Sequence, residues 1–256
     1  MKVTLLGTGT SHGIPMIGCH CDVCASKDPR DKRLRSSIFI ETTETNILID
    51  TTPDFRQQAL KANIKRIDAI LYTHAHKDHL AGLDDIKPFN YILKKAIPIY
   101  AEQNVINTIE NEFDYAFKIP DNSVPKLILN PITPDKTFEI GTIKIIPIHM
   151  MHGNLPVLGF RIGDFAYLTD FKTIEQNELQ KVMGVKTLII EALRLKPHPS
   201  HQSFKEALEI IKVINPQSAI LTHISHKLGK HCEIKEFSPP QIRAGYDNEM
   251  LNISDI

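Results

Sequence analysis

The sequence predicts an α/β protein in which two β-sheets pack against each other and helices cover their outer faces. Two observations carry this expectation. Apolar residues make up 42% of the 256 residues, enough to fill a large core. Short apolar runs typical of strands recur in both halves of the chain, and each half also contains segments with helical periodicity. Because no linker or low-complexity tract separates the halves, we expect one domain over residues 1–256.

The first half begins with a short strand, Lys2 to Leu6, that runs into the glycine-containing loop Gly7 to Thr10. Pro53 favours the start of a helix that reaches about Asn63, because the first helical position does not need an amide hydrogen. Apolar runs between polar turns predict strands at Ser37 to Glu41, Asn46 to Asp50, Ile67 to Tyr72 and Ile97 to Tyr100, and a helix at Glu102 to Phe113.

The second half repeats this alternation. Ser203 followed by Glu206 predicts a capped helix over Phe204 to Val213, since the two side chains can bond each other's backbone amides. The expected strands are Thr137 to Glu139, Ile143 to Ile148, Val157 to Ile162, Phe165 to Thr169, Leu188 to Glu191 and Ser218 to Thr222.

Charge and composition narrow the possible partners and location. Lysine plus arginine and aspartate plus glutamate both number 30, so no overall field draws the protein to nucleic acid or to an anionic membrane. The start of the chain lacks the apolar run of a secretory signal, and no segment approaches the roughly 20 apolar residues of a membrane span. The four cysteines do not resemble a secreted disulfide framework. We expect a soluble, cytoplasmic protein.

The run Thr73-His74-Ala75-His76-Lys77-Asp78-His79 is the strongest chemical signal in the chain. Neutral imidazole and ionised carboxylate are the usual ligands of zinc and related divalent ions. Alternate side chains of an extended segment point the same way, so His74 and His76 can reach one ion together. Asp78 and His79 follow where the chain turns into a helix and face a second position. This arrangement is typical of a two-metal hydrolase.

Two ions need more ligands than one loop supplies, and further candidates lie near the ends of predicted strands. They are His149, His152, Asp170, His201 and His223. Side chains gathered at one edge of a sheet can converge on one site. Asp170 alone would also suit the cap of a helix, because it precedes a segment, Phe171 to Gln180, with helical character.

With these residues in view, the chain resembles the metallo-β-lactamase superfamily over essentially its whole length. The resemblance implies a four-layer α/β/β/α sandwich. It also implies that His74, His76 and His152 bind one metal, that Asp78, His79 and His223 bind the other, and that Asp170 bridges them. His152 has the expected spacing to the segment Leu155 to Phe160, and His149 is the alternative ligand.

A second cluster lies in the loop Gly18-Cys19-His20-Cys21-Asp22-Val23-Cys24. Three thiolates in this spacing can bind zinc tetrahedrally, and a closed site needs a fourth ligand. His226, three residues beyond His223, is the first candidate, with Cys232 and His20 as alternatives. Because the loop has few apolar residues to hold it, a zinc ion would supply much of its folding free energy.

The finer motifs resemble the cyclic phosphodiesterases of phosphonate breakdown, which are themselves similar to the tRNA 3′-processing ribonucleases. The shared motifs are Thr8 to Pro15, the Cys-x-Cys-x-x-Cys loop, Leu48 to Asp50 with Pro53 to Arg56, and Thr222 to His226. This resemblance implies that His201 assists catalysis, with His198 the weaker choice, and that Asp78 is a ligand that also orients the nucleophile. Asp50 is expected to orient a ligand histidine.

We therefore expect a hydrolase with two active-site metal ions, zinc or manganese, and one structural zinc, acting on a small, cyclic phosphodiester. Ser11, His12 and the backbone from Thr8 to Gly13 are candidates for contact with substrate. The segment Asp84 to Tyr91 is expected to form one wall of the pocket and is a candidate homodimer contact.

Three other functions stay open at this point. A tRNA 3′-processing endonuclease would need a basic, glycine-rich arm that the sequence lacks, so nucleic acid is not an expected partner. A thiolester or lactam hydrolase shares the expected fold. A metal-stabilised binding module without catalysis would not need so many convergent ligands.

Overall fold

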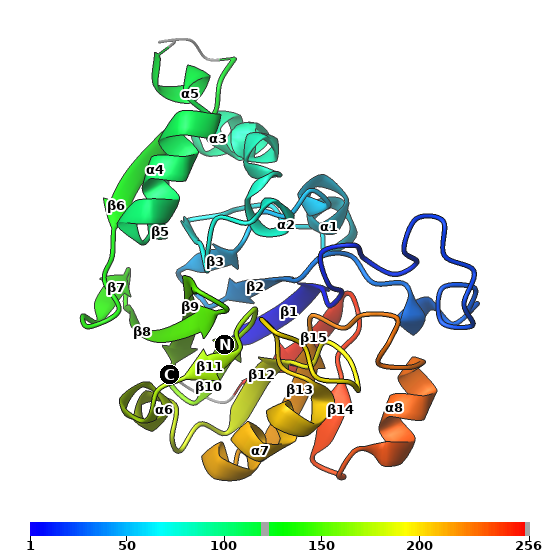
Figure 1. Cartoon of the computed structure of the whole chain (residues 1–256). Helices are drawn as coiled ribbons and strands as arrows, with labels where there is room; N and C mark the ends of the chain where they lie inside the picture. The colour runs from blue at the N-terminus through cyan, green and yellow to red at the C-terminus, as the bar shows by residue number, and fades with distance from the viewer. Residues whose placement is uncertain (119–122, 254–256) are drawn as a thin grey trace.

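The computed structural model of the chain describes residues 1–118 and 123–253, and Figure 1 shows two central sheets with helices on either side. The first sheet has the order β15-β1-β2-β3-β4-β5-β6. Its strands are β1 (Lys2–Gly7), β2 (Ser37–Glu41), β3 (Asn46–Ile49), β4 (Ala69–Leu71), β5 (Ile97–Ala101), β6 (Leu127–Pro131) and β15 (Glu249–Asn252).

The second sheet has the order β11-β8-β9-β10-β12-β13-β14, with β7 paired to β8 off this path. Its strands are β7 (Phe138–Ile140), β8 (Ile143–His152), β9 (Leu155–Ile162), β10 (Phe165–Leu168), β11 (Thr173–Ile174), β12 (Thr187–Glu191), β13 (Ser218–Thr222) and β14 (Ile242–Ala244). The strands β10, β12, β13 and β14 run parallel, so their carboxyl ends meet at one edge.

The alternation of side chains along the strands explains the layers. In β2, Ile38 and Ile40 point into the cluster between the two sheets, and Phe39 points outward beneath the helices of the first half. In β12, Ile189 points into the same central cluster, and Ile190 faces the helices of the second half. The chain thus folds into helices, sheet, sheet and helices, and the expected four-layer α/β/β/α sandwich is confirmed.

The outer layers are built from short helices. Over the first sheet lie α1 (Phe55–Lys61), α2 (Lys77–Leu80), α3 (Lys87–Leu93), α4 (Gln103–Glu112) and α5 (Tyr115–Lys118), with the 3₁₀ turn η2 (Leu83–Ile86). Over the second lie α6 (Gln176–Lys181), α7 (Phe204–Ile214) and α8 (His231–Phe237), while η1 (Pro29–Asp31) belongs to the loop between β1 and β2. Ser203 and Glu206 form the expected capping box of α7.

Several boundaries differ from the expectation. The helix expected from Phe171 begins only at Gln176, because residues 173–174 pair with β8 as strand β11. The strand expected to end at Ile148 continues to His152, since residues Ile146 to His152 of β8 pair with β9. The short edge strands β14 and β15 and helix α8 were not expected. None of the helices in the described ranges is both long and apolar enough to cross a membrane.

Candidate metal centre and active site

Polar side chains follow the carboxyl ends of strands from both sheets. Asp50 comes after β3, the histidine run after β4, Asp170 after β10 and His223 after β13. Asp50, Asp170 and His223 have φ angles of 65°, 55° and 53°, a left-handed backbone that is uncommon outside glycine. Such strain is typical of functional sites, where the surrounding fold holds a side chain in one direction.

Asp170 lies at the centre of the cluster. Its Oδ2 is 2.6 Å from His79 Nε2 and 3.5 Å from His74 Nε2, and its Oδ1 is 2.8 Å from His223 Nδ1. Apart from these contacts with Asp170, the three buried ring nitrogens have no hydrogen-bonding partner among the described residues. Leaving buried polar atoms without partners is costly, so the donor set fits divalent cations placed between the imidazoles and the carboxylate.

The charges of the cluster support this fit. Burial alone would lower the pKa of His79, but the charges of Asp170, Asp78 and Asp50 raise it well above its usual value. Burial would raise the pKa of Asp170, but His223 and His79 hold it well below its usual range. Ionised carboxylates that are buried among imidazoles favour the binding of a cation.

His76 and His152 lie beside this centre. The ring centroids of His74 and His76 are 4.6 Å apart, and those of His76 and His152 are 5.1 Å apart. His152 Nδ1 lies 2.7 Å from the Ser200 carbonyl oxygen, which leaves its Nε2 free to bind a cation. His149 is three residues earlier on β8 and therefore on the other face of the strand. The structure thus brings His152, and not His149, next to His76.

Asp50 and Asp78 flank His79. Asp50 Oδ2 lies 2.7 Å from His79 Nδ1, and Asp50 also accepts hydrogen bonds from the backbone amide and the hydroxyl of Thr73, both at 2.9 Å. It therefore turns His79 Nε2 toward Asp170, the orienting contact expected of it. Asp78 Oδ2 is 3.4 Å from His79 Nε2, on the side from which it can share a cation.

His201 lies between the metal centre and the surface. Its ring centroid is 4.4 Å from that of His152 and 5.0 Å from that of His223. His201 Nδ1 is 2.8 Å from Glu191 Oε2, so the other ring nitrogen is the one that can exchange a proton with a substrate. His198 lies further out, its centroid 5.0 Å from that of His201, with its Nδ1 accepting a hydrogen bond from the Ser200 amide.

Glu191 is the functional residue that the sequence analysis missed. It is fully buried at the end of β12, accepts a hydrogen bond from the Phe171 amide and holds His201 in place. Burial, together with the charge of Asp170, raises its pKa well above the usual value. Its only sequence signal is a carboxylate at the end of a buried strand, the same signal that led to Asp170.

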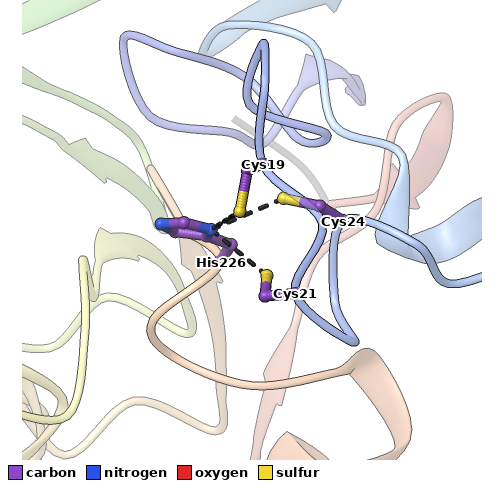
Figure 2. A group of neighbouring side chains, drawn as sticks. All are labelled: Cys19, Cys21, Cys24 and His226. Carbon is purple, nitrogen blue, oxygen red and sulfur yellow. Dashed lines mark hydrogen bonds between the residues drawn. The ribbon is translucent and has the colours of Figure 1, made fainter.

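The cysteine loop forms a second cluster, the clip, which consists of Cys19, Cys21, Cys24 and His226. The three Sγ atoms lie 3.2, 3.4 and 3.4 Å from His226 Nδ1 (Figure 2). A tetrahedral zinc with its usual bond lengths would place sulfur and nitrogen about 3.6 Å apart, so the clip has nearly the right size. His20 and Cys232 are exposed and lie outside this group.

A cavity of about 310 Å³ opens beside His201. Among the described residues that line it, none is Asp or Glu. The lining consists of Thr10, Ser11, His12, Gly13, Met16, Leu193, Arg194, His198, His201, Ser225, His226 and Lys227. The expectation that Asp84 to Tyr91 forms a wall was wrong for this cavity, because its walls come from the loop after β1 and the loops after β12 and β13.

Comparisons with known proteins agree with this geometry. Residues 45–224 match the family described as the Beta-lactamase superfamily domain. The chain belongs to the metallo-β-lactamase superfamily, as its sequence motifs indicated. The crystal structure of a diphosphatase from the PhnP family is 38% identical with a TM-score of 0.92, and the match covers 99% of this chain and 98% of that one. The chain is therefore a member of the PhnP family.

Two curated relatives differ in what they are named for. An octanoyltransferase from Porphyromonas gingivalis is 44% identical over 250 residues, which cover 96% of this chain but 50% of the relative. The chain thus spans half the length of that relative. A ribonuclease Z from Methanopyrus kandleri is 27% identical over 245 residues, covering 78% of this chain and 84% of the relative. The superfamily match and the histidine and aspartate cluster support a metal-binding hydrolase.

Proposed function

We propose that the protein is a binuclear metal-dependent phosphodiesterase that hydrolyses a small, cyclic phosphodiester. One observation carries this proposal: the cavity lined by His201 and Thr10, which both contact His223, contains Arg194 and Lys227 and no described carboxylate. In a chain with equal numbers of acidic and basic residues, such a lining favours an anionic substrate. The negatively charged phosphoryl oxygens of a phosphodiester could lie against these two cations.

The ligands divide between two ions. His74, His76 and His152 would hold one, and Asp78, His79 and His223 the other, with Asp170 between them; the clip would hold a structural zinc. Zinc and manganese both suit imidazole and carboxylate ligands, and availability decides between them. When bound, the pair supplies a strong nucleophile at neutral pH and neutralises charge on the phosphoryl oxygens.

The chain's own residues perform the remaining steps. Asp78 accepts a hydrogen bond from the attacking water and so directs it at phosphorus. His201 donates the proton on its free ring nitrogen to the leaving oxygen, which would otherwise depart as an alkoxide. Glu191 holds His201 at the other nitrogen, 2.8 Å away, and so keeps the free ring nitrogen directed at the leaving oxygen. Arg194 and Lys227 bind a further anionic group of the substrate.

A second candidate reaction is the hydrolysis of a diphosphate bond. The similarity to a PhnP-family diphosphatase favours it, and so does a cationic cavity next to the metal centre, because both phosphoryl groups of a diphosphate carry charge. A tRNA-processing role has weaker support, since the net charge is zero and no basic arm is found in the sequence.

The test uses purified protein loaded in turn with Mn²⁺, Zn²⁺ and Co²⁺. Substrates are bis(p-nitrophenyl) phosphate, a 2′,3′-cyclic nucleotide, a ribose cyclic phosphate and an unsymmetrical dinucleoside diphosphate. Nitrocefin and a glutathione thiolester serve as the competing substrates. We expect turnover of a phosphodiester or diphosphate only. Turnover of the thiolester or nitrocefin alone would overturn the proposal, as would no phosphoryl hydrolysis with any of the three metals.

A further inference from the structure

The segment after β13 belongs to both metal-type clusters. His223 Nδ1 lies 2.8 Å from Asp170 Oδ1, and three residues later His226 Nδ1 faces the three thiols of the clip. Between them, Ser225 donates its hydroxyl hydrogen to the Leu193 carbonyl at 2.7 Å, which fixes the segment on the end of β12. His226 also lines the cavity, followed by Lys227. One wall of the cavity therefore connects the metal centre to the clip.

The opposite wall is the loop from Thr10 to Met16. At its inner end, the Thr10 amide donates to the Ile224 carbonyl at 3.1 Å, and Thr10 Oγ1 lies 3.3 Å from His223 Nε2. At its outer end, the Met16 amide donates to Cys24 Sγ at 3.4 Å, and the Cys19 amide donates to the Met16 carbonyl at 3.0 Å. This wall is thus anchored inside by the first wall and outside by the clip.

Besides the clip, the outer end of this wall is held by Met16 and Cys19, which pack half-buried against the core, and by Lys32 Nζ, which donates to the Cys24 carbonyl at 3.0 Å. Ile14 and Arg33 exchange two backbone hydrogen bonds of 2.8 Å, which close the base of the loop. Beyond that base, Val23 and Cys24 are the buried apolar residues of the described loop, and Ile17 is 95% exposed. A loop with so little apolar burial does not fix its own conformation. The clip joins the two walls directly at the cavity mouth, because its thiols and His226 come from opposite walls.

We propose that the clip is a positioning element of the substrate site, in which His226 and Cys24 hold the two cavity walls together and set the affinity for an anionic substrate. The proposal rests on the proposed function only for the choice of ligand. The clip acts on binding because it touches the cavity lining. It leaves the chemical step unchanged because the Asp170 cluster is anchored on strand ends and contacts the loop only at Thr10, the inner end, which the clip does not touch.

The test compares four variants of the full-length protein. His226→Ala and Cys21→Ser each remove one ligand of the clip, and Cys21 is exposed, so its replacement disturbs packing least. His226→Cys replaces the imidazole by a fourth thiolate and keeps a complete zinc ligand set. Cys232→Ser changes an exposed thiol outside the clip and is the matched control. Elemental analysis counts zinc and active-site metal in each protein.

We expect His226→Ala and Cys21→Ser to lose one zinc per chain and to keep the active-site pair. Their KM for the cleaved substrate should rise about tenfold or more, with kcat within about threefold of the parent, since only ground-state binding is lost. His226→Cys and Cys232→Ser should keep the zinc and the parental KM. If His226→Cys restores the parental KM, the clip acts by joining the walls. If it does not, the imidazole itself contacts the substrate.

Calorimetric binding of inorganic pyrophosphate to the metal-loaded proteins separates the inference from the proposed function. If the parent protein cleaves no phosphodiester, the proposed function fails. The inference is still supported if His226→Ala and Cys21→Ser bind pyrophosphate more weakly than the parent and His226→Cys binds it equally well. Equal binding by all proteins overturns it. Loss of the active-site metals together with the clip zinc also overturns it, because the clip would then stabilise the whole fold and not the cavity.

Discussion

The two clusters at the end of β13 are built in different ways. The Asp170 cluster takes its residues from the ends of β4, β8, β10 and β13, and Asp170, His74, His79 and His223 are buried. The clip takes three of its four residues from a loop between β1 and β2, and Cys21 is exposed. The sheets therefore fix the geometry of the first cluster in advance, while the second depends on what binds between its own side chains.

The thiols of the clip also differ among themselves. Burial raises the pKa of Cys24 to about 11, whereas the hydrogen bond from the Cys24 backbone lowers the pKa of Cys21 to about 6. Since zinc binds thiolates, its entry into the clip must displace protons, and this links metal binding to loop folding. Under the proposed function, the sandwich would build the reaction centre in advance, and a zinc in the clip would fix a loop that the sheets do not hold.

The largest effect should come from Asp170→Asn. This change removes the negative charge between His79 and His223 and should reduce active-site metal content. Because outer-shell changes already cost roughly 10–100-fold, loss of a central ligand should lower kcat/KM by at least about 1,000-fold. Clip zinc, measured in the same sample by elemental analysis, should stay near one per chain. Loss of metal from both clusters would contradict this prediction, since the clusters would then depend on each other.

His201→Ala should rank next. Removal of a general acid lowers kcat by roughly 10²–10⁴-fold, and the metal content of both clusters should be unchanged. The effect should be large for an alkoxide leaving group and small for p-nitrophenolate, which departs without a proton. Steady-state rates on the two kinds of substrate check this. An equal loss on both, or a loss of metal, would mean that His201 is a ligand.

Sequence reasoning works where a signal is local. The spacing from His74 to His79 and the apolar alternation of Ile38, Phe39 and Ile40 each depend on neighbouring residues, and the structure keeps both patterns. Strand ends also point to the site, because parallel strands bring Asp170 and His223 to one edge. The four-layer fold follows from these patterns and from the family resemblance.

What the sequence could not show depends on contacts between distant segments. Glu191 becomes important because β12 places it beside His201, and nothing around it in sequence marks that contact. The helix expected from Phe171 is delayed because residues 173–174 pair with β8. The edge strands β14 and β15 are short and acquire their conformation from the strands beside them. Tertiary pairing overrode local propensity at each of these places.

Asp50→Asn should have an intermediate effect. An asparagine amide that donates to His79 Nδ1 would leave the ring proton on Nε2, the nitrogen that faces Asp170, so the ring could not bind a cation there. We expect roughly a 10–100-fold loss of active-site metal affinity, measured by competition with a chelating dye. Asp247→Asn is the matched control, because Asp247 is also buried but bonds Thr8 and Leu34 away from the cluster. If Asp247→Asn lost metal and Asp50→Asn did not, the role assigned to Asp50 would be wrong.

The smallest effect should come from Lys227→Met, next to the clip ligand His226. Lys227 is exposed, so its attraction to an anionic group of the substrate is weakened by water and amounts to about 0.2–1 kcal/mol. KM should therefore rise roughly two- to fivefold, with kcat unchanged. Both zinc content and active-site metal should stay at parental levels, because methionine keeps the length of the stem. The control is Lys65→Met, which replaces an exposed lysine between α1 and β4 and should change neither constant.

Raising the ionic strength should shrink the difference between Lys227→Met and the parent, since salt screens an exposed charge. If the difference persists in high salt, the methionine has altered the cavity wall, and Lys227 then belongs with the clip as a positioning residue.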